Sequence, residues 1–305
     1  MFLLIKKDEN MADTKRQHYV PRFLLKHFCV DGRTINVTDL IEKRTYQANI
    51  MKVAQEKYFY NLNTNKGKVS LEKQYAGLED KAAPIVDKIV KTESIGWFTD
   101  ENFQILEDLI LCQFYRTRKY VNHVKAFLQA NNIPLFDLVD ADGNVKKTLC
   151  CEDVGIDDNV ARVISYNFLY DVEHNGGVRD AIASMEWLLL KATGKEKFIT
   201  SDNPTILNNH LASIEDKGET TGFDLPHSQI FLPISSKLML TLTAGSMAEE
   251  SRTRLLKVMI KGIPVVISDA FRCSITGEAA RCPDVLVKLF NETQKRNAER
   301  FIYNS

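Results

Sequence analysis

The sequence lacks the short motifs that identify the common classes of enzyme site. It contains no GxxxxGK[ST] phosphate loop, no GxGxxG segment after a strand, no HExxH and no GxSxG. These absences argue against the usual nucleotide-dependent enzymes, zinc proteases and serine hydrolases. They leave room for an unusual active site.

Paired cysteines and long apolar runs are also missing. None of the six cysteines belongs to a CxxC pair, so free thiols in a reducing cytosol are favoured over disulfides or structural zinc. No segment approaches the roughly 18 uninterrupted apolar residues of a membrane span. The apolar run at residues 2–5 is shorter than the roughly 7 to 15 residues of a signal-peptide core. We therefore expect a cytoplasmic protein with no membrane partner, in which residues 1–12 are a leader.

The chain has no excess of charge of either sign, with 40 basic and 40 acidic residues. This balance argues against non-specific polyanion binding as the main role, because such proteins usually carry a basic excess. Two local basic groups, at residues 116–125 and 252–261, would hold a phosphate chain if their faces were contiguous. Separate solvated faces are the alternative.

The hydrophobic pattern predicts both helices and strands within the 305 residues. Helical spacing covers residues 71–91, 100–129, 153–168, 177–193, 246–259 and 279–302. Strand patterns cover residues 33–38, 44–50, 53–62, 197–200, 229–232, 238–242 and 264–268. We expect residues 132–151 to be irregular. The sequence therefore predicts an α+β fold in which residues 13–305 form a single mixed domain, with a helical middle and short strands near the N-terminus and in the C-terminal third.

Polar residues occur on helix faces that should be apolar. Gln113 falls in the middle of the apolar stripe of the 100–129 helix, and Arg116 lies at the edge of that face. A buried arginine needs an acidic partner, and Glu79 on the 71–91 helix is our first choice. The pair is either a structural link between two helices or part of the wall of a pocket.

Two further polar residues lie outside these helices. Asp202 follows a short strand, where ligand sites often lie in α/β sheets, so it would hold a metal or act as a base. The alternative is a turn in which Asp202 accepts from its own backbone before Pro204. His18 precedes Pro21 by three residues and would be a general base, a metal ligand or a phosphate-binding donor, or else a core residue.

The segment at residues 18–25 (HYVPRFLL) resembles a bacterial and phage family, Domain of Unknown Function 4238. The resemblance runs over residues 17–303 and includes residues 113–116 (QFYR) and 200–204 (TSDNP). The family has no assigned activity, so the resemblance implies no reaction. What it adds is that the family motifs coincide with the polar residues singled out above.

Our leading hypothesis is a metal-dependent hydrolase acting on a phosphodiester in nucleic acid or a nucleotide. Its site gathers His18, Glu79, Gln113, Arg116 and Asp202. Glu79 and Asp202 would hold Mg²⁺ or Mn²⁺, which prefer oxygen ligands. His18 would be the general base, and Arg116 would neutralise developing charge.

The alternative hypothesis is a non-catalytic binding or sensing module, one that recognises a phage or host component. A toxin or defence effector of either type is a third. Exposure discriminates between the first two, because a polar cluster sealed from solvent favours a structural role. Neither the substrate nor the oligomeric state follows from the sequence.

Overall fold

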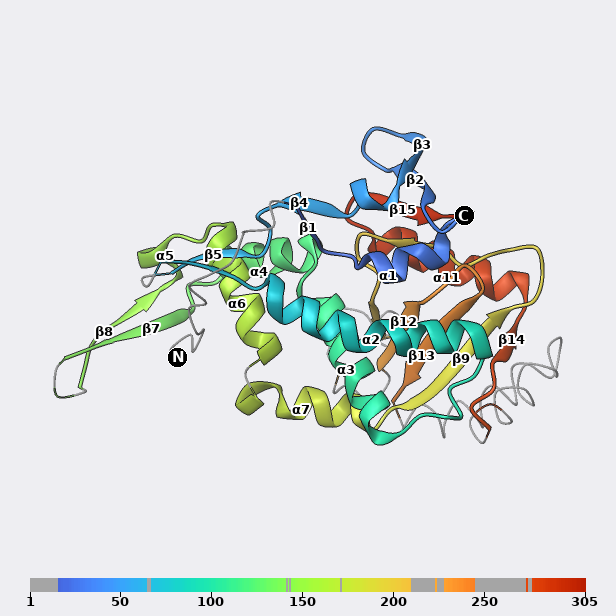
Figure 1. Ribbon diagram of the computed structural model, residues 1–305. Helices are drawn as coiled ribbons and strands as arrows, with labels where there is room; N and C mark the ends of the chain where they lie inside the picture. Colours follow the sequence, from blue (N-terminus) through green and yellow to red (C-terminus); the bar gives the residue numbers. More distant parts are fainter. Residues whose placement is uncertain are drawn as a thin grey trace.

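A five-stranded sheet forms the centre of the protein (Figure 1). The computed structural model describes residues 16–64, 67–140, 142, 144–170, 172–209, 223, 228–244, 273 and 276–305. The strands of the sheet are β11 (Ile206–Asn209), β12 (Ser228–Pro233), β13 (Leu238–Thr243), β9 (Glu186–Ala192) and β14 (Ala280–Cys282), in that spatial order. β14 runs parallel to β9, and the other neighbours are antiparallel.

Helices cover both faces of this sheet, because its strands are apolar on both sides. Leu189 and Leu240 belong to the large core that includes helices α2 (Glu72–Thr92) and α3 (Asp100–Tyr115). Leu190 and Met239, one position along each strand, belong to a second core with helix α11 (Asp284–Asn297). Successive side chains of a strand point to opposite faces, which accounts for this alternation. Figure 1 shows α2 lying across the front of the sheet.

A second sheet joins the two ends of the chain. Its strands, in spatial order, are β10 (Thr200–Ser201), β15 (Phe301–Asn304), β2 (Thr34–Asp39) and β3 (Arg44–Asn49). All neighbours are antiparallel, with Tyr303 opposite both Thr200 and Val37. The strands predicted at residues 33–38 and 44–50 are thereby confirmed.

Shorter elements complete the described structure. Strand β1 (Arg16–His18) pairs with β4 (Gln55–Lys57), and two hairpins are formed by β5 (Asn61–Thr64) with β6 (Gly67–Ser70) and by β7 (Pro134–Val139) with β8 (Val145–Cys150). The remaining helices are α1 (Arg22–Leu25), α4 (Arg118–Ala130), α5 (Cys151–Val154), α6 (Asp158–Tyr170) and α7 (Val172–Ala183), with 3₁₀ turns at Lys26–Phe28 and Ile50–Lys52. Figure 1 shows the β7–β8 hairpin projecting from the body of the protein.

The helix predicted over residues 100–129 is wrong as one element, because the chain breaks it in two. α3 ends at Tyr115, and Arg116 has φ −90° and ψ 0°. Thr117 then adopts an extended backbone, and its hydroxyl accepts from the backbone N–H of Tyr120 as the N-cap of α4. A threonine hydroxyl at this position favours a new helix start over continuation of the old one.

Three other sequence predictions are also corrected. The helix expected over residues 177–193 ends at Ala183 and is followed by β9, whose two apolar faces mimic a buried helix. The helix expected over residues 279–302 is α11 flanked by β14 and β15. The segment expected to be irregular, residues 132–151, contains the β7–β8 hairpin.

The α+β class is confirmed, with helices and several sheets sharing one large core. All six cysteines are free. Among the described helices, none has the length and apolar character needed to span a bilayer. The leader at residues 1–12, the helix at 246–259, the strand at 264–268 and the basic group at 252–261 lie outside the described residues.

Candidate functional site

Arg116 lies at the junction of α3 and α4, with its guanidinium buried between elements. Its side chain is 0% exposed, and Nη1 lies 2.8 Å from Oε1 of Glu79 on α2. The side chain of Glu79 is 26% exposed. The predicted Glu79–Arg116 pair is therefore confirmed, and it connects two helices that pack against the same face of the sheet.

Other side chains enclose the guanidinium from the remaining sides. With its amide oxygen turned toward Arg116, Gln113 accepts from Nε at 2.8 Å. The guanidinium carbon lies 5.2 Å from the ring centre of Tyr75 and 5.8 Å from that of Tyr60, within range of cation–π attraction. Burial acts to lower the pKa of Arg116, but its electrostatic partners, Glu79 among them, raise it above the usual value, so Arg116 stays charged. We call these five residues the Arg116 cluster.

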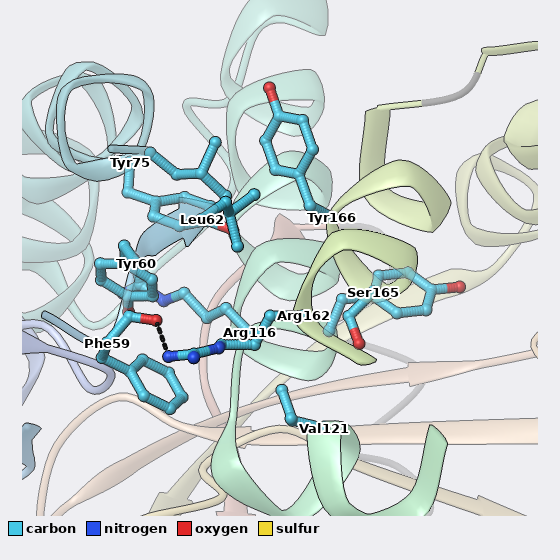
Figure 2. A pocket seen from close by; sticks show the side chains of 11 residues that line it. Phe59, Tyr60, Leu62, Tyr75, Arg116, Val121, Arg162, Ser165 and Tyr166 are labelled. Atoms are coloured by element: carbon cyan, nitrogen blue, oxygen red, sulfur yellow. Dashed lines mark hydrogen bonds between the residues drawn. The ribbon is translucent and has the colours of Figure 1, made fainter. Parts of the chain in front are cut away.

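The cavity beside the Arg116 cluster is small. Its volume is about 20 Å³, which is room for about one water molecule. Figure 2 shows Tyr60, Tyr75 and Arg116 on its wall, together with Arg162, whose Nη1 donates to the Phe59 carbonyl at 2.9 Å. A space of this size admits no nucleotide. The guanidinium of Arg116 is 0% exposed, which by the exposure criterion favours a structural role for the Arg116 cluster.

His18 lies at the end of β1, near the Arg116 cluster. The Tyr60 hydroxyl donates to the His18 carbonyl at 2.9 Å. Burial and then the charge of Arg22 lower the pKa of His18 from 6.5 to about 4, and Arg116 acts in the same direction. Its Nε2 is buried without a hydrogen-bond partner in the described part of the chain. His18 is therefore a neutral imidazole close to two guanidinium groups.

The Asp202 carboxylate is committed to the backbone that precedes β15. Oδ1 accepts from the N–H of Glu299 at 2.9 Å, and Oδ2 accepts from those of Arg300 and Phe301 at 2.8 and 2.9 Å. Burial raises the pKa of Asp202, while these backbone donors act against burial. Asp202 thus ties the end of β10 to the C-terminal strand, as a structural carboxylate does.

The structure does not join the two proposed metal ligands. No hydrogen bond or ion pair between these described residues connects Asp202 with Glu79 or Arg116. One oxygen of Glu79 contacts Arg116, and both oxygens of Asp202 accept backbone donors. Within the described ranges, no cluster of three or more His, Cys, Asp or Glu suits a metal ion. The residues present therefore do not fit the expected Mg²⁺ or Mn²⁺ site.

The basic group at residues 116–125 is also neutralised by partners. Arg118 and Lys125 both contact Asp158, at 2.8 Å each, and Arg118 also contacts Glu56. Lys119 donates to a backbone carbonyl at 2.9 Å. These contacts leave no row of free cations on α4 for a phosphate chain.

A much larger cavity lies elsewhere, between α3 and β9, with a volume of about 600 Å³. One wall is a stripe of α3 formed by Asp100, Phe103, Gln104 and Glu107. These residues stand at positions i, i+3, i+4 and i+7, so they share one face of the helix. The opposite wall comes from residues 185–187 at the start of β9, with Ala183 at the end of α7.

Three aromatic rings meet at this cavity. The ring centre of Phe103 lies 5.4 Å from that of Trp187 and 4.9 Å from that of Phe98, both in edge-to-face geometry. The ring centres of Phe98 and Trp187 are 6.5 Å apart. Such pairs are stabilising beyond the area they bury, so the aromatic wall is preformed. We call this space the α3–β9 cavity.

Comparison with known families decides the classification. The family model for Protein of unknown function (DUF4238) matches residues 16–305. The chain belongs to this family. Neither the curated proteins nor the solved structures gave a match. The resemblance noted in the sequence is confirmed, and the function of this DUF4238 protein has to be argued from its geometry.

The sequence of this DUF4238 chain does not predict the α3–β9 cavity. The sequence predicts a helix at Trp187, whereas Trp187 lies near the start of β9. Glu107 and Asp100 are acids in a helical pattern, where such residues are typical of a solvated face. The available signal was the seven-residue spacing of two acids around Phe103, close after the Trp97–Phe98 pair.

We expect Glu79→Gln to destabilise the protein by about 2 to 4 kcal/mol, because it leaves the buried Arg116 without a counter-charge. Urea denaturation of the purified variant measures this change. The matched control is Glu292→Gln, which removes one partner of an exposed pair with Lys295 and should change stability by less than about 1 kcal/mol. Equal effects of the two substitutions would contradict the structural role of the Arg116 cluster.

We expect the free energy of unfolding to fall as the pH is lowered from 6.5 toward 4. The folded protein holds the pKa of His18 at about 4, so the unfolded chain takes up a proton first and unfolding is favoured in this window. One such group contributes a slope of at most about 1.4 kcal/mol per pH unit. Urea titrations at several pH values should show a shallower slope for His18→Gln, and an unchanged slope for His123→Gln on the exposed side of α4. Burial also lowers the pKa of His27, so the His18→Gln variant should keep the part of the slope that His27 contributes.

Proposed function

We propose that the protein is a non-catalytic binding or sensing module that holds a small ligand in the α3–β9 cavity. The observation that carries this proposal is the cavity itself, because about 600 Å³ lies within the roughly 300 to 1,000 Å³ of small-molecule sites. Its lining has the usual composition of such sites, with aromatic and apolar side chains and a few polar groups. The phage or host component expected for such a module would supply the ligand.

The Arg116 cluster lies at the other end of α3 and fixes the helix that forms one wall of the cavity. The helix carries one wall of the cavity at Asp100, Phe103 and Glu107, and it ends at the buried Arg116. The pair with Glu79 holds α3 against α2, and Leu106 and Ile110 bury its inner face. A wall fixed in this way loses little conformational freedom when a ligand binds, which favours affinity.

A cavity-filling substitution tests the proposed function. Ala183 is an exposed residue at the cavity, so Ala183→Trp should place an indole in the space and abolish binding. The measurement is a ligand-detected NMR screen of a fragment library against the wild type, followed by the variant. Ala126→Trp, on the exposed face of α4, is the matched control and should keep every hit. Hits that survive Ala183→Trp would contradict this site.

A phosphodiester hydrolase is the second candidate, and the observation that favours it is His18. A neutral imidazole, whose buried Nε2 has no hydrogen-bond partner among the described residues, lies close to Arg22 and Arg116. An imidazole base beside guanidinium groups suits an anionic phosphate substrate in nucleic acid or a nucleotide. In this form the hydrolase would not use Glu79 and Asp202 as metal ligands, because Oε1 of Glu79 contacts Arg116 and both oxygens of Asp202 accept backbone donors.

Hydrolysis of bis(p-nitrophenyl) phosphate and of single-stranded DNA tests the second candidate. Under the binding proposal we expect no turnover with Mg²⁺, with Mn²⁺ or without added metal. We also expect millimolar Mn²⁺ to leave the melting temperature unchanged, because ligand binding would raise it. Turnover that is lost in His18→Ala and kept in His123→Ala would establish the hydrolase and displace the first candidate.

A further inference from the structure

The α3–β9 cavity has acidic side chains and no basic ones among the described residues that line it. Asp100, Glu107 and Glu186 contribute to its wall, and none of the lining residues that the structure describes is Lys, Arg or His. Asp100 and Glu107 make no ion pair within the described part of the chain. Arg179 is the cation that acts on Glu107, but it pairs with Asp108 and does not line the cavity. The described part of the wall therefore presents the carboxylates of Asp100 and Glu107 without a paired cation among the described residues.

Partial burial makes one of these charges more responsive to a ligand. Burial, and then the neighbouring Asp108, raise the pKa of Glu107, with Arg179 acting in the opposite direction. A partly buried carboxylate has already lost some of its hydration. Binding a cation there removes less water from the carboxylate, so the desolvation cost is smaller. Asp100, at the exposed first turn of α3, gives a second negative charge nearer the solvent.

We propose that the α3–β9 cavity binds a small organic cation, with an ammonium or guanidinium group held by Asp100 and Glu107 and its carbon atoms against Phe98, Phe103 and Trp187. This inference rests on the proposed function and names the ligand class for the same cavity. Aromatic rings attract cations through their quadrupoles as well as packing against carbon. The adjoining segment already shows this attraction, because Nζ of Lys88 lies 3.7 Å from the ring centre of Trp97.

The wall favours an organic cation over a metal ion. A bare divalent ion needs about six oxygen ligands at short range, whereas Phe98, Phe103, Met185 and Trp187 offer none. A substituted ammonium carries its charge on a weakly hydrated, partly apolar surface. Such a ligand interacts with both parts of the lining, because the carboxylates attract its charge and the aromatic rings pack against its carbon atoms.

Three probes of nearly equal shape test this inference. Choline is the cation, 3,3-dimethylbutan-1-ol is its neutral isostere, and 3,3-dimethylbutyrate is the anion of similar size. Ligand-detected NMR titrations of the full chain give the dissociation constants. We expect choline to bind at least about tenfold more tightly than the neutral alcohol, which is the effect of one desolvated cation–π or charge contact. The anion should not bind.

Variants on one helix locate the charge effect. Glu107→Gln should weaken choline binding about tenfold and leave the neutral alcohol unchanged. Glu101→Gln, an exposed acid on the same turn of α3 as Asp100 that does not line the cavity, is the matched control and should change neither. Circular dichroism and the melting temperature establish that both variants fold.

The outcomes separate the ligand class from the proposed function. Equal binding of choline and the alcohol, abolished by Ala183→Trp, would overturn the cation inference and keep a binding cavity. Tighter binding of the anion would overturn it in the same way. If none of the three binds while library fragments bind and are lost in Ala183→Trp, the cation inference fails alone. Choline binding that survives both Glu107→Gln and Ala183→Trp would overturn the cation site.

Discussion

A single buried ion pair constrains much of this structure. Arg116 is placed where α3 stops and α4 starts, and its side chain is 0% exposed. An unpaired charge there would cost several kcal/mol, so α2 has to bring Glu79 to it. Two tyrosine rings and the amide of Gln113 complete the enclosure. The direction of α3 relative to α2, and hence to the central sheet, depends on satisfying this group.

The two ends of α3 have different surroundings. The C-terminal end of α3 is sealed, with space for about one water molecule, whereas its N-terminal half borders a cavity of about 600 Å³. Polar residues occur at both ends for different reasons. At the sealed end each has a partner inside the protein. At the open end Asp100 and Glu107 line the cavity, whose volume is the reason that we place the ligand there.

Asp202 shows how one carboxylate serves as a structural element. Three backbone N–H groups of residues 299–301 donate to it, so the chain after α11 is held where β15 can pair with both β10 and β2. The expected turn, in which Asp202 accepts from its own backbone before Pro204, is wrong, because its backbone donors are those of residues 299–301. They belong to a segment almost a hundred residues away, and local spacing does not reveal such a partner.

Local pattern in the sequence determined the helices and strands whose periodicity is unambiguous. It also determined which polar residues lie on buried helix faces. It predicted helix α2, strands β2 and β3, and the burial of Gln113 and Arg116. The pair of Arg116 with Glu79 was also predictable, because a buried charge needs an acidic partner within reach. Only the tertiary structure decided that 186–192 is a strand, since apolar residues on both faces suit a central strand and a buried helix equally. It likewise decided that Asp202 and Glu79 belong to different clusters and that Asp100, Glu107 and Trp187 share a cavity, because long-range packing sets those distances.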